Sequence, residues 1–112
     1  MEITTRTVGK CNILDCSGKL ILGPATATLR EAIRKAFKDG VSRVVLNLAH
    51  VNYIDSSGIG EMISGYVHVK NLGGNMSLLK LNEKILKLLV IAKLLAIFDV
   101  FDDEGEALEG CE

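Results

Sequence analysis

The sequence predicts an α/β domain in which helices pack on a mixed, mostly parallel sheet of about five strands. After an N-terminal pair of strand-like segments, β-branched apolar runs alternate with segments of helical periodicity, which is typical of strand–helix–strand units. The run RVVLNL (43–48) is almost continuously apolar, as expected for a strand of a parallel sheet that is buried on both faces. A chain of 112 residues supports one hydrophobic core, so we expect a single domain over 1–112.

The chain is expected to begin with a β-hairpin. Residues 3–8 and 11–17 read as two strands, and the dipeptide Gly-Lys between them suits a tight turn. Gly18 is expected to end the second strand, and a connection through Pro24 then leads to the first helix.

That first helix is predicted over residues 28–39. Its apolar residues recur at positions i, i+4, i+7 and i+8 and therefore share one face; they are Leu29, Ile33, Ala36 and Phe37. Thr28 followed by Glu31 fits a capping box at the start of the helix, and Gly40 suits its C-terminal stop.

The rest of the chain continues the alternation of strands and helices. The predicted elements are a strand over 43–48, a helix over 57–71, a strand over 75–81, a helix over 82–92 and a strand over 96–101. Asn82 is a natural N-cap for the third helix. A short helix around 104–109 is expected to close the chain.

The charges of the chain are unevenly distributed. The net charge is −1, but the C-terminal segment 99–112 carries seven acidic side chains and no basic one, which leaves the first 98 residues with an excess of six positive charges. The basic side chains are spread over several segments, whereas binding of nucleic acid needs clustered Lys and Arg. We therefore expect no nucleic-acid partner and a solvated acidic segment.

Nothing in the sequence predicts secretion or insertion into a membrane. The N-terminal residues lack the apolar stretch of a signal peptide. The longest apolar stretch, 85–98, contains two lysines and falls short of the roughly 20 apolar residues that a membrane span needs. We expect this stretch to belong to the core.

The three cysteines, Cys11, Cys16 and Cys111, are read as free buried thiols. Their number is odd, no CxxC occurs, and the two histidines are far apart in sequence. The sequence therefore predicts a reducing, cytoplasmic location and no metal site.

The stretch YIDSSGIGEM (53–62) is the most informative one, because it places Asp55, Ser56 and Ser57 between a strand and a helix. It is not a dinucleotide fingerprint, since Ile63 stands where GxGxxG requires its third glycine. The chain lacks the Gly-Lys-Ser/Thr of a phosphate loop, and neither serine lies in the GxSxG of a nucleophile elbow. With two separated histidines as the only imidazole bases, we expect no catalytic residues and no enzyme.

The residues of this turn have two interpretations. In the structural one, Asp or Ser side chains cap the helix by accepting hydrogen bonds from its first N–H groups, and the glycines permit a tight reversal. In the functional one, an exposed serine at the helix N-terminus carries a phosphate, which the N–H groups and the helix dipole favour. A new charge of about −1.5 to −2 beside Asp55 would repel a docking partner, so the serine would act as a switch.

The chain resembles the STAS domain and, within it, the bacterial anti-sigma factor antagonists. The most specific part of the resemblance is VVLNLAHVNYIDSSGIG (44–60), where a buried strand leads into Asp-Ser-Ser-Gly-hydrophobic-Gly. Supporting stretches are SGKLILGPATATLREAI, LGGNMSLLKLN and ILKLLVIAKLLAIFDVF, so that the resemblance covers nearly all of the chain.

This resemblance implies a regulatory binding module and no cofactor of its own. The serine after the aspartate, Ser56, corresponds to the phosphoacceptor of the antagonists. The implied partners are an anti-sigma factor that is a serine kinase and uses ATP, and a metal-dependent serine phosphatase that reverses the modification. The unphosphorylated antagonist binds the kinase and frees the sigma factor.

The residues expected to bind the partner cluster around Ser56; they are Asp55, Ser57, Gly58, Glu61 and Ser64. Asp55 is expected to orient the turn, and Ser57 to serve as an N-cap or a first-turn residue. Glu61 and Ser64 are expected on the exposed side of the helix, whereas Met62, Ile63 and Tyr66 are expected in the core.

One departure from the family favours an alternative function. Many antagonists have Gly-Glu-Leu-Asp after the second strand, and here the same stretch ends in Ile21 in place of the acid. The alternative is a STAS scaffold that does not cycle phosphate, either in a stressosome-like complex or as the soluble partner of a membrane lipid transporter.

Overall fold

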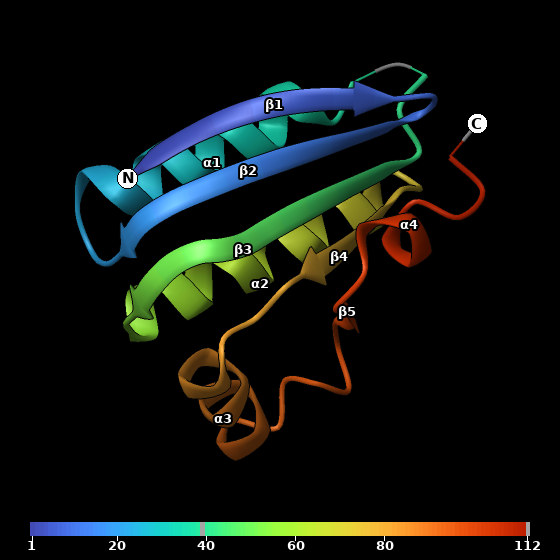
Figure 1. Cartoon of the computed structure of the whole chain (residues 1–112). Coiled ribbons are helices and arrows are strands. Elements are labelled where there is room, and N and C mark those ends of the chain that lie inside the picture. Colours follow the sequence, from blue (N-terminus) through green and yellow to red (C-terminus); the bar gives the residue numbers. More distant parts are fainter. Residues whose placement is uncertain (39, 112) are drawn as a thin grey trace.

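The predicted arrangement of strands and helices is confirmed by a computed structural model, which describes residues 1–38 and 40–111. Its elements follow the chain in the order β1 (Glu2–Val8), β2 (Cys11–Leu20), α1 (Pro24–Ala36), β3 (Arg43–Ile54), α2 (Ser56–Asn71), β4 (Asn75–Leu79), α3 (Glu83–Ile91), β5 (Asp99–Phe101) and α4 (Glu104–Ala107). The strands lie side by side in chain order, with β1 antiparallel to β2 and all other neighbours parallel (Figure 1). The fold class is therefore a single mixed, mostly parallel α/β sheet, as expected.

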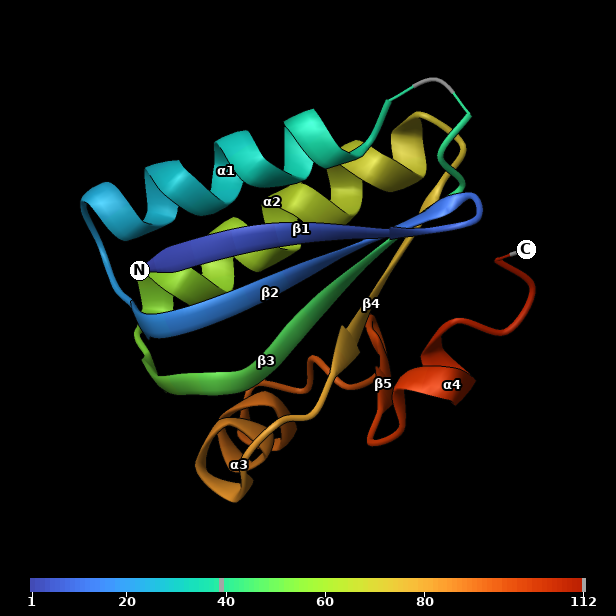
Figure 2. The ribbon, with the colours of Figure 1, turned by 45° about the horizontal axis from the view of Figure 1, so that its top comes forward.

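Helices α1 and α2 lie next to each other on one face of the sheet (Figure 2). Between them and the strands lies the main core, which includes Leu14, Leu29, Ile33, Leu46, Met62, Val69 and Leu78. The two helices approach closely at Gly65, where a Cβ atom would lie 2.5 Å from the Cδ1 atom of Ile33. The opposite face carries a smaller cluster in which α4 covers β2, β3 and β4; it contains Ile13, Val45, Leu79 and Ala107.

Several predicted element bounds are wrong, and each error has a local cause. Strand β2 continues through Gly18 to Leu20, because this glycine adopts a φ of +106° at an irregularity in the pairing with β3. Helix α1 begins at Pro24, whose fixed φ suits the first turn. Thr28 therefore lies inside the helix and donates to the carbonyl of Pro24, so the predicted capping box is absent.

The remaining bounds agree better with the expectation. Strand β3 is longer than predicted and takes up the residues before the serine turn, while β5 is shorter. Asn82 caps α3 as expected, because its side chain accepts from the N–H of Ile85 at 2.8 Å. Asp39, at the predicted end of the first helix, and Glu112, the last acidic residue, lie outside the described residues.

The prediction of three free thiols is wrong for two of them, since Cys11 and Cys111 form a disulfide. The C-terminal segment folds back across the start of β2, and this contact joins residues 100 positions apart that the sequence alone does not bring together. Cys16 is free and buried as expected. Burial raises the pKa of its thiol to about 12.

The apolar stretch 85–98 is only partly core. Ile85, Leu89, Leu94 and Phe98 are buried, whereas Leu86, Val90, Ile91, Leu95 and Ile97 are exposed. None of the helices in the described part of the chain is long and apolar enough to cross a membrane.

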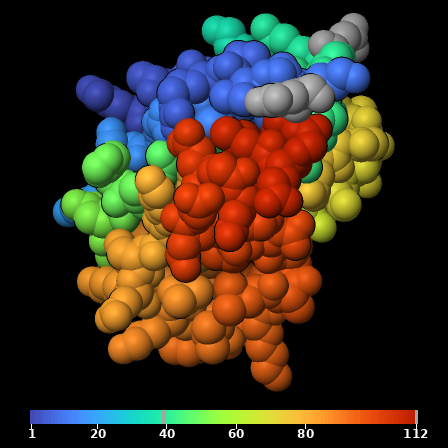
Figure 3. All heavy atoms as spheres, turned by 45° about the vertical axis from the view of Figure 1, so that its right-hand side comes forward, coloured from blue at the N-terminus to red at the C-terminus, as the bar shows by residue number. Residues whose placement is uncertain are grey.

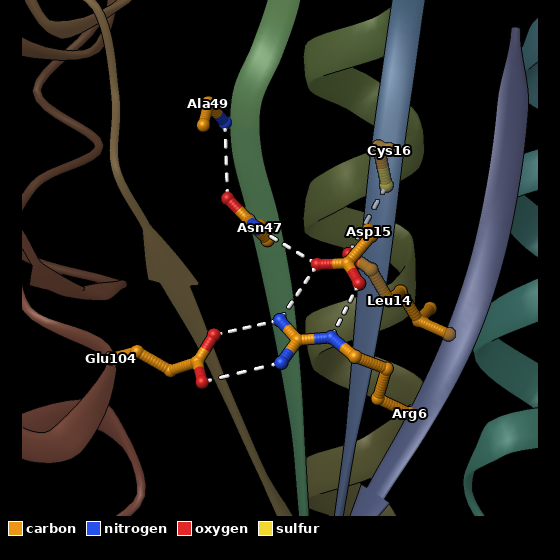
Figure 4. A network of polar contacts seen from close by, with 7 residues as sticks. All are labelled: Arg6, Leu14, Asp15, Cys16, Asn47, Ala49 and Glu104. Atoms are coloured by element: carbon orange, nitrogen blue, oxygen red, sulfur yellow. Dashed lines mark hydrogen bonds and ion pairs between the residues drawn. The ribbon is translucent and has the colours of Figure 1, made fainter.

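The described acids of the C-terminal segment are exposed as expected, except for Glu104, which is half-buried and is held against the sheet by Arg6 of β1. The guanidinium of Arg6 donates to Asp15 of β2 at 2.5 and 2.9 Å and to Glu104 of α4 at 2.7 and 3.2 Å (Figure 4). The amide of Asn47 adds a bond of 2.8 Å to Asp15. These bonds from Arg6 are the main cause that lowers the pKa values of the carboxyl groups of Asp15 and Glu104.

Candidate functional site

The serine turn lies at the carboxyl end of β3, where the chain passes into α2. Asp55 is the N-cap of this helix, and its Oδ1 atom accepts from the N–H of Gly58 at 2.8 Å. Its Oδ2 atom accepts from the N–H of Leu22 at 3.0 Å, so one carboxylate joins the connections that follow β2 and β3. The backbone bonds from Leu22 and Gly58 lower the pKa of Asp55, because they stabilise the charged form of its carboxyl group.

Gly58 lets α2 start directly against the end of β2. A Cβ atom at this position would lie 2.3 Å from the carbonyl oxygen of Leu20 and 2.9 Å from a side-chain carbon of Ile54. By contrast, a Cβ atom at Gly60 would meet nothing within 4 Å. Gly58 is thus required by packing, and its predicted part in partner binding stays a prediction.

Ser56 is the first residue of α2 and is exposed, whereas Ser57 in the same turn is half-buried. A hydroxyl at this position can be reached from solvent and stands at the N-terminus of α2, where Asp55 already accepts from the N–H of Gly58. The expected presentation of Ser56 to solvent is therefore right. Asp55 supplies the N-cap, and Ser57 takes the other predicted place, in the first turn.

Three exposed apolar side chains flank the turn; they are Ile21, Leu22 and Tyr53. Leu22 is 74% exposed although its backbone is fixed by Asp55. The ring of Tyr53 lies 5.6 Å from the Nζ atom of Lys84, which reaches over from α3. We call these three residues the apolar rim. Ile21 stands out in the sequence as a departure from the family pattern, whereas Leu22 and Tyr53 were not predicted. Their signal is an apolar residue close to the end of a strand.

The predicted exposure of Glu61 is wrong, because this residue is only 7% exposed. Helix α2 turns the face with Glu61 toward α1, and Arg30 of α1 donates to its carboxylate at 2.6 and 3.1 Å. The side chain of Arg30 itself is about half exposed, so it is the arginine that a partner would meet. Ser64 is exposed as predicted and lies beside the shallow groove between the two helices.

Met62, expected in the core, is fully buried there, while Ile63 and Tyr66 pack against it from partly buried positions. The edge of the Tyr66 ring meets Phe98 with the ring centroids 5.3 Å apart. The predicted core face of α2 is thus confirmed.

The chemistry available at the turn is that of an accessible hydroxyl next to a fixed carboxylate. His68 follows Ser56 by twelve residues on the same helix, which places it about 18 Å away along the axis, too far to act as its base. Over residues 1–38 and 40–111, no group of three or more His, Cys, Asp or Glu side chains is placed to hold a metal ion. An exposed hydroxyl and a fixed carboxylate are therefore the polar groups that the turn offers.

The chain is similar to known proteins in sequence and in structure. The model of the STAS domain family matches residues 2–107. An anti-sigma F factor antagonist of Paenibacillus polymyxa is 32% identical over 69 residues, which make up 62% of this chain and 59% of that protein. The matched part thus spans about three fifths of this relative.

Solved structures share the fold. The crystal structure of the Thermotoga maritima protein TM1081 has a TM-score of 0.87 at 23% identity and covers 97% of this chain and 93% of its own. The phosphorylated form of SpoIIAA from Bacillus has a TM-score of 0.73 at 21% identity, and the match covers 96% of this chain and 97% of that one. The unphosphorylated form of this anti-sigma factor antagonist gives a TM-score of 0.71. At these identities the likeness supports the fold alone.

Proposed function

This chain belongs to the STAS domain family, and on that premise we propose that it is an anti-sigma factor antagonist switched by reversible phosphorylation of Ser56. The unphosphorylated form binds an anti-sigma factor that is a serine kinase and thereby regulates transcription. The observation that carries this proposal is the exposed Ser56 at the head of α2, beside a fixed Asp55, within a chain related to a named antagonist.

A phosphate on Ser56 fits the folded domain. The positive end of the α2 dipole favours a dianion at this place. The modification adds about −1.5 to −2 charges at neutral pH. Because Ser56 is exposed, the domain need not unfold to carry this charge.

The same phosphate would oppose docking. It stands close to the carboxylate of Asp55 and next to the apolar rim, which a partner covers when it binds. Covering the rim removes water from the dianion, and a buried charge without a counter-charge is costly. The phosphate is thus compatible with the fold and unfavourable in the complex.

The contact residues follow from exposure and position. Ser56, Ser64 and the apolar rim face the partner, and Ser57 and Gly58 shape the turn. Glu61 acts indirectly, because it holds Arg30 at the surface between α1 and α2. ATP belongs to the kinase, and a metal-dependent phosphatase removes the phosphate, so the chain acts without a cofactor and not as an enzyme. Nucleic acid and membrane insertion play no part in this function.

The test compares Ser56→Asp with Ser56→Ala against candidate anti-sigma factor kinases by titration calorimetry. We expect Ser56→Asp to bind about 30- to 150-fold more weakly, which corresponds to roughly 2–3 kcal/mol of uncompensated charge in the interface. Ser56→Ala should bind like the wild type. Asn71→Asp, at the exposed far end of α2, adds one charge away from the turn and should leave the affinity unchanged.

Mass-spectrometric mapping after incubation with kinase and Mg-ATP provides the second readout. A gain of about 80 Da per chain, the mass of a phosphoryl group, is expected on Ser56 and is lost in Ser56→Ala. Equal kinase affinity of Ser56→Asp and Ser56→Ala, or phosphate on another residue, contradicts the switch.

We also propose that the chain acts in the cytoplasm, where the Cys11–Cys111 disulfide would be unusual because cytosolic thiols are kept reduced. Alkylation of denatured chain taken directly from cells counts the free thiols. One free thiol per chain, that of Cys16, is expected where the disulfide persists. Cell fractionation tests the cytoplasmic location itself, and recovery of the chain outside the cytoplasm contradicts it.

The exposed Ile21 favours a second candidate, a scaffold of a stressosome-like complex or a soluble partner of a membrane lipid transporter. Its apolar side chain suits permanent docking better than a cycle of attachment and release. Co-purification as a stable stoichiometric assembly, unaffected by Ser56→Asp, would favour this function over the switch.

A further inference from the structure

One of the hollows in the surface lies at the end of the sheet opposite Ser56, where the C-terminal segment crosses the amino ends of β3, β4 and β5. It has a volume of about 250 Å³. Its walls include Arg43, Ser77, Asp99, Phe101, Glu106 and Glu109, and we call it the tail groove. Figure 3 shows the segment that borders it, in red, on the surface between the N-terminal strands in blue and the residues after α3 in orange.

The unpartnered hydroxyl of Ser77 is the observation that indicates a ligand. It lies on β4 between Val45 and Asp99 of the neighbouring strands and is only 1% exposed. Its Oγ atom is buried and has no hydrogen-bond partner among the residues that the structure describes. A hydroxyl buried without a partner costs free energy, and such groups are uncommon in folded proteins. A bound group that hydrogen-bonds to Ser77 would remove this cost.

The charge of the groove defines the kind of ligand. Three carboxylates line it, those of Asp99, Glu106 and Glu109, against the one guanidinium of Arg43. Arg43 is already engaged, since its Nη1 atom donates to the carbonyls of Ala107 and Glu109 at 2.7 and 2.9 Å. The groove therefore has an excess of negative charge and favours a cation.

An organic cation fits these walls better than a bare metal ion. No three His, Cys, Asp or Glu side chains, here or elsewhere in the described ranges 1–38 and 40–111, are placed so that they could hold one metal ion together. The ring of Phe101 adds an aromatic wall, which attracts an ammonium or guanidinium group and accommodates its aliphatic chain. Such groups offer several N–H donors, and a hydroxyl and carboxylates are their natural acceptors.

We propose that the tail groove binds an aliphatic ammonium or guanidinium group, which donates a hydrogen bond to the Oγ atom of Ser77 and pairs with Asp99 and Glu106. The group comes either from a free small amine or from a Lys or Arg side chain of another protein. This site is separate from Ser56, which stands at the opposite end of β3, so it does not depend on the proposed antagonist function.

The test is a titration of the isotope-labelled full chain followed by NMR. The probes are 1,4-diaminobutane, butylguanidinium and a blocked peptide with one lysine; 1-butanol serves as the neutral control. Saturable shifts at the amides of Ser77, Asp99 and Glu106 are expected with dissociation constants between about 0.1 and 1 mM for the small cations. Tighter binding of the diamine indicates a small-molecule source, and tighter binding of the peptide a protein source.

Variants decide whether the groove itself is responsible. Ser77→Ala should bind about five-fold more weakly through the lost hydrogen bond, and Asp99→Asn about ten-fold more weakly through the lost charge. Asp102→Asn removes an exposed acid that does not line the groove and should change nothing. Ser56→Asp should also leave cation binding unchanged, which separates this proposal from the switch.

Several results would overturn the proposal. One is the absence of saturation at about ten times the expected dissociation constants. Another is an equal loss of affinity in Asp99→Asn and Asp102→Asn, which would mean a general attraction to the acidic tail. A third is unchanged binding by Ser77→Ala, which would mean that water alone satisfies the hydroxyl.

Discussion

The two ends of the parallel sheet are built in different ways. At the carboxyl end, a short motif organises the site: Asp55 binds the N–H of Gly58, three residues later, and Ser56, the first of the two serines between them, is presented to solvent. At the amino end, the contacts join residues far apart in sequence, such as Arg43 with Ala107 and Cys11 with Cys111. The motif at the first end is therefore readable from consecutive residues, although Asp55 also accepts from the distant N–H of Leu22. The contacts at the second end form only once the chain has folded.

The largest expected effect concerns the amino end. Cys111→Ser should lower the free energy of unfolding by about 4 kcal/mol, because a crosslink over a separation of 100 residues restricts the unfolded chain strongly. Urea denaturation of the oxidised wild type and of the variant measures the difference. Reduced wild type should resemble the variant, since both lack the bond.

Hydrogen exchange locates this effect. The N–H of Lys10 donates to the carbonyl of Cys111 at 2.6 Å and should exchange faster after reduction of the disulfide. The N–H of Gly58 should keep its rate of exchange through local opening, because its bond to Asp55 is unaffected. If both amides lost the same local protection, the two ends would form one cooperative unit and the contrast between them would be wrong.

The second prediction tests the carboxyl end. Gly58→Ala should lower the free energy of unfolding by about 3 kcal/mol, because the added methyl group would meet the backbone carbonyl of Leu20 at 2.3 Å. Gly60→Ala, two residues along the same helix, meets nothing and should raise stability by roughly 0.5–1 kcal/mol. Thermal unfolding of both variants measures the difference, and equal effects would mean that Gly58 has no special place in the turn.

The carboxyl end was predictable because its signals are local. Alternating strands and helices gave the order of elements, and Asp55, Ser56 and Gly58 marked the turn. The burial of Glu61 was not predictable. Helical periodicity assigns residues to the faces of a helix, but it does not say which polar face a neighbouring helix covers. Here α1 lies against that face and supplies Arg30.

Most contacts at the amino end could not be predicted from the sequence. Charge composition alone describes the C-terminal acids as solvated, and it does not reveal that Arg6 of β1 binds Glu104, 98 residues away. An odd number of cysteines likewise gives no pairing. Ser77 in a run of apolar residues was a visible anomaly, but its meaning depends on the segment that folds over it.

The third prediction uses pH to separate the two ends. The carboxyl pKa values of Asp15, Glu104 and Asp55 are lower in the folded chain, so their contribution to stability is complete above the unfolded pKa of about 4 and is lost as the pH falls below it. Arg6→Met removes the partner of Asp15 and Glu104 and should cost about 1 kcal/mol at pH 7, since the groups are partly exposed.

Stability measured against pH provides the readout. The loss on acidification should be smaller in Arg6→Met than in the wild type, and the part that remains should include Asp55, whose pKa is lowered by backbone N–H groups that the variant retains. An acid transition identical in the two proteins would mean that Arg6 does not bind the tail in solution.

The smallest effect compares two serines at opposite ends of the sheet. Ser56→Ala changes an exposed side chain and should alter the free energy of unfolding by less than about 0.5 kcal/mol. Ser77→Ala removes a buried hydroxyl that lacks a partner and should raise it by about 1 kcal/mol in the absence of ligand. Urea denaturation at pH 7 distinguishes these outcomes. A gain in stability together with weaker cation binding would mean that the hydroxyl is kept for a ligand at the expense of the fold, whereas a loss of stability would mean that ordered water already satisfies it.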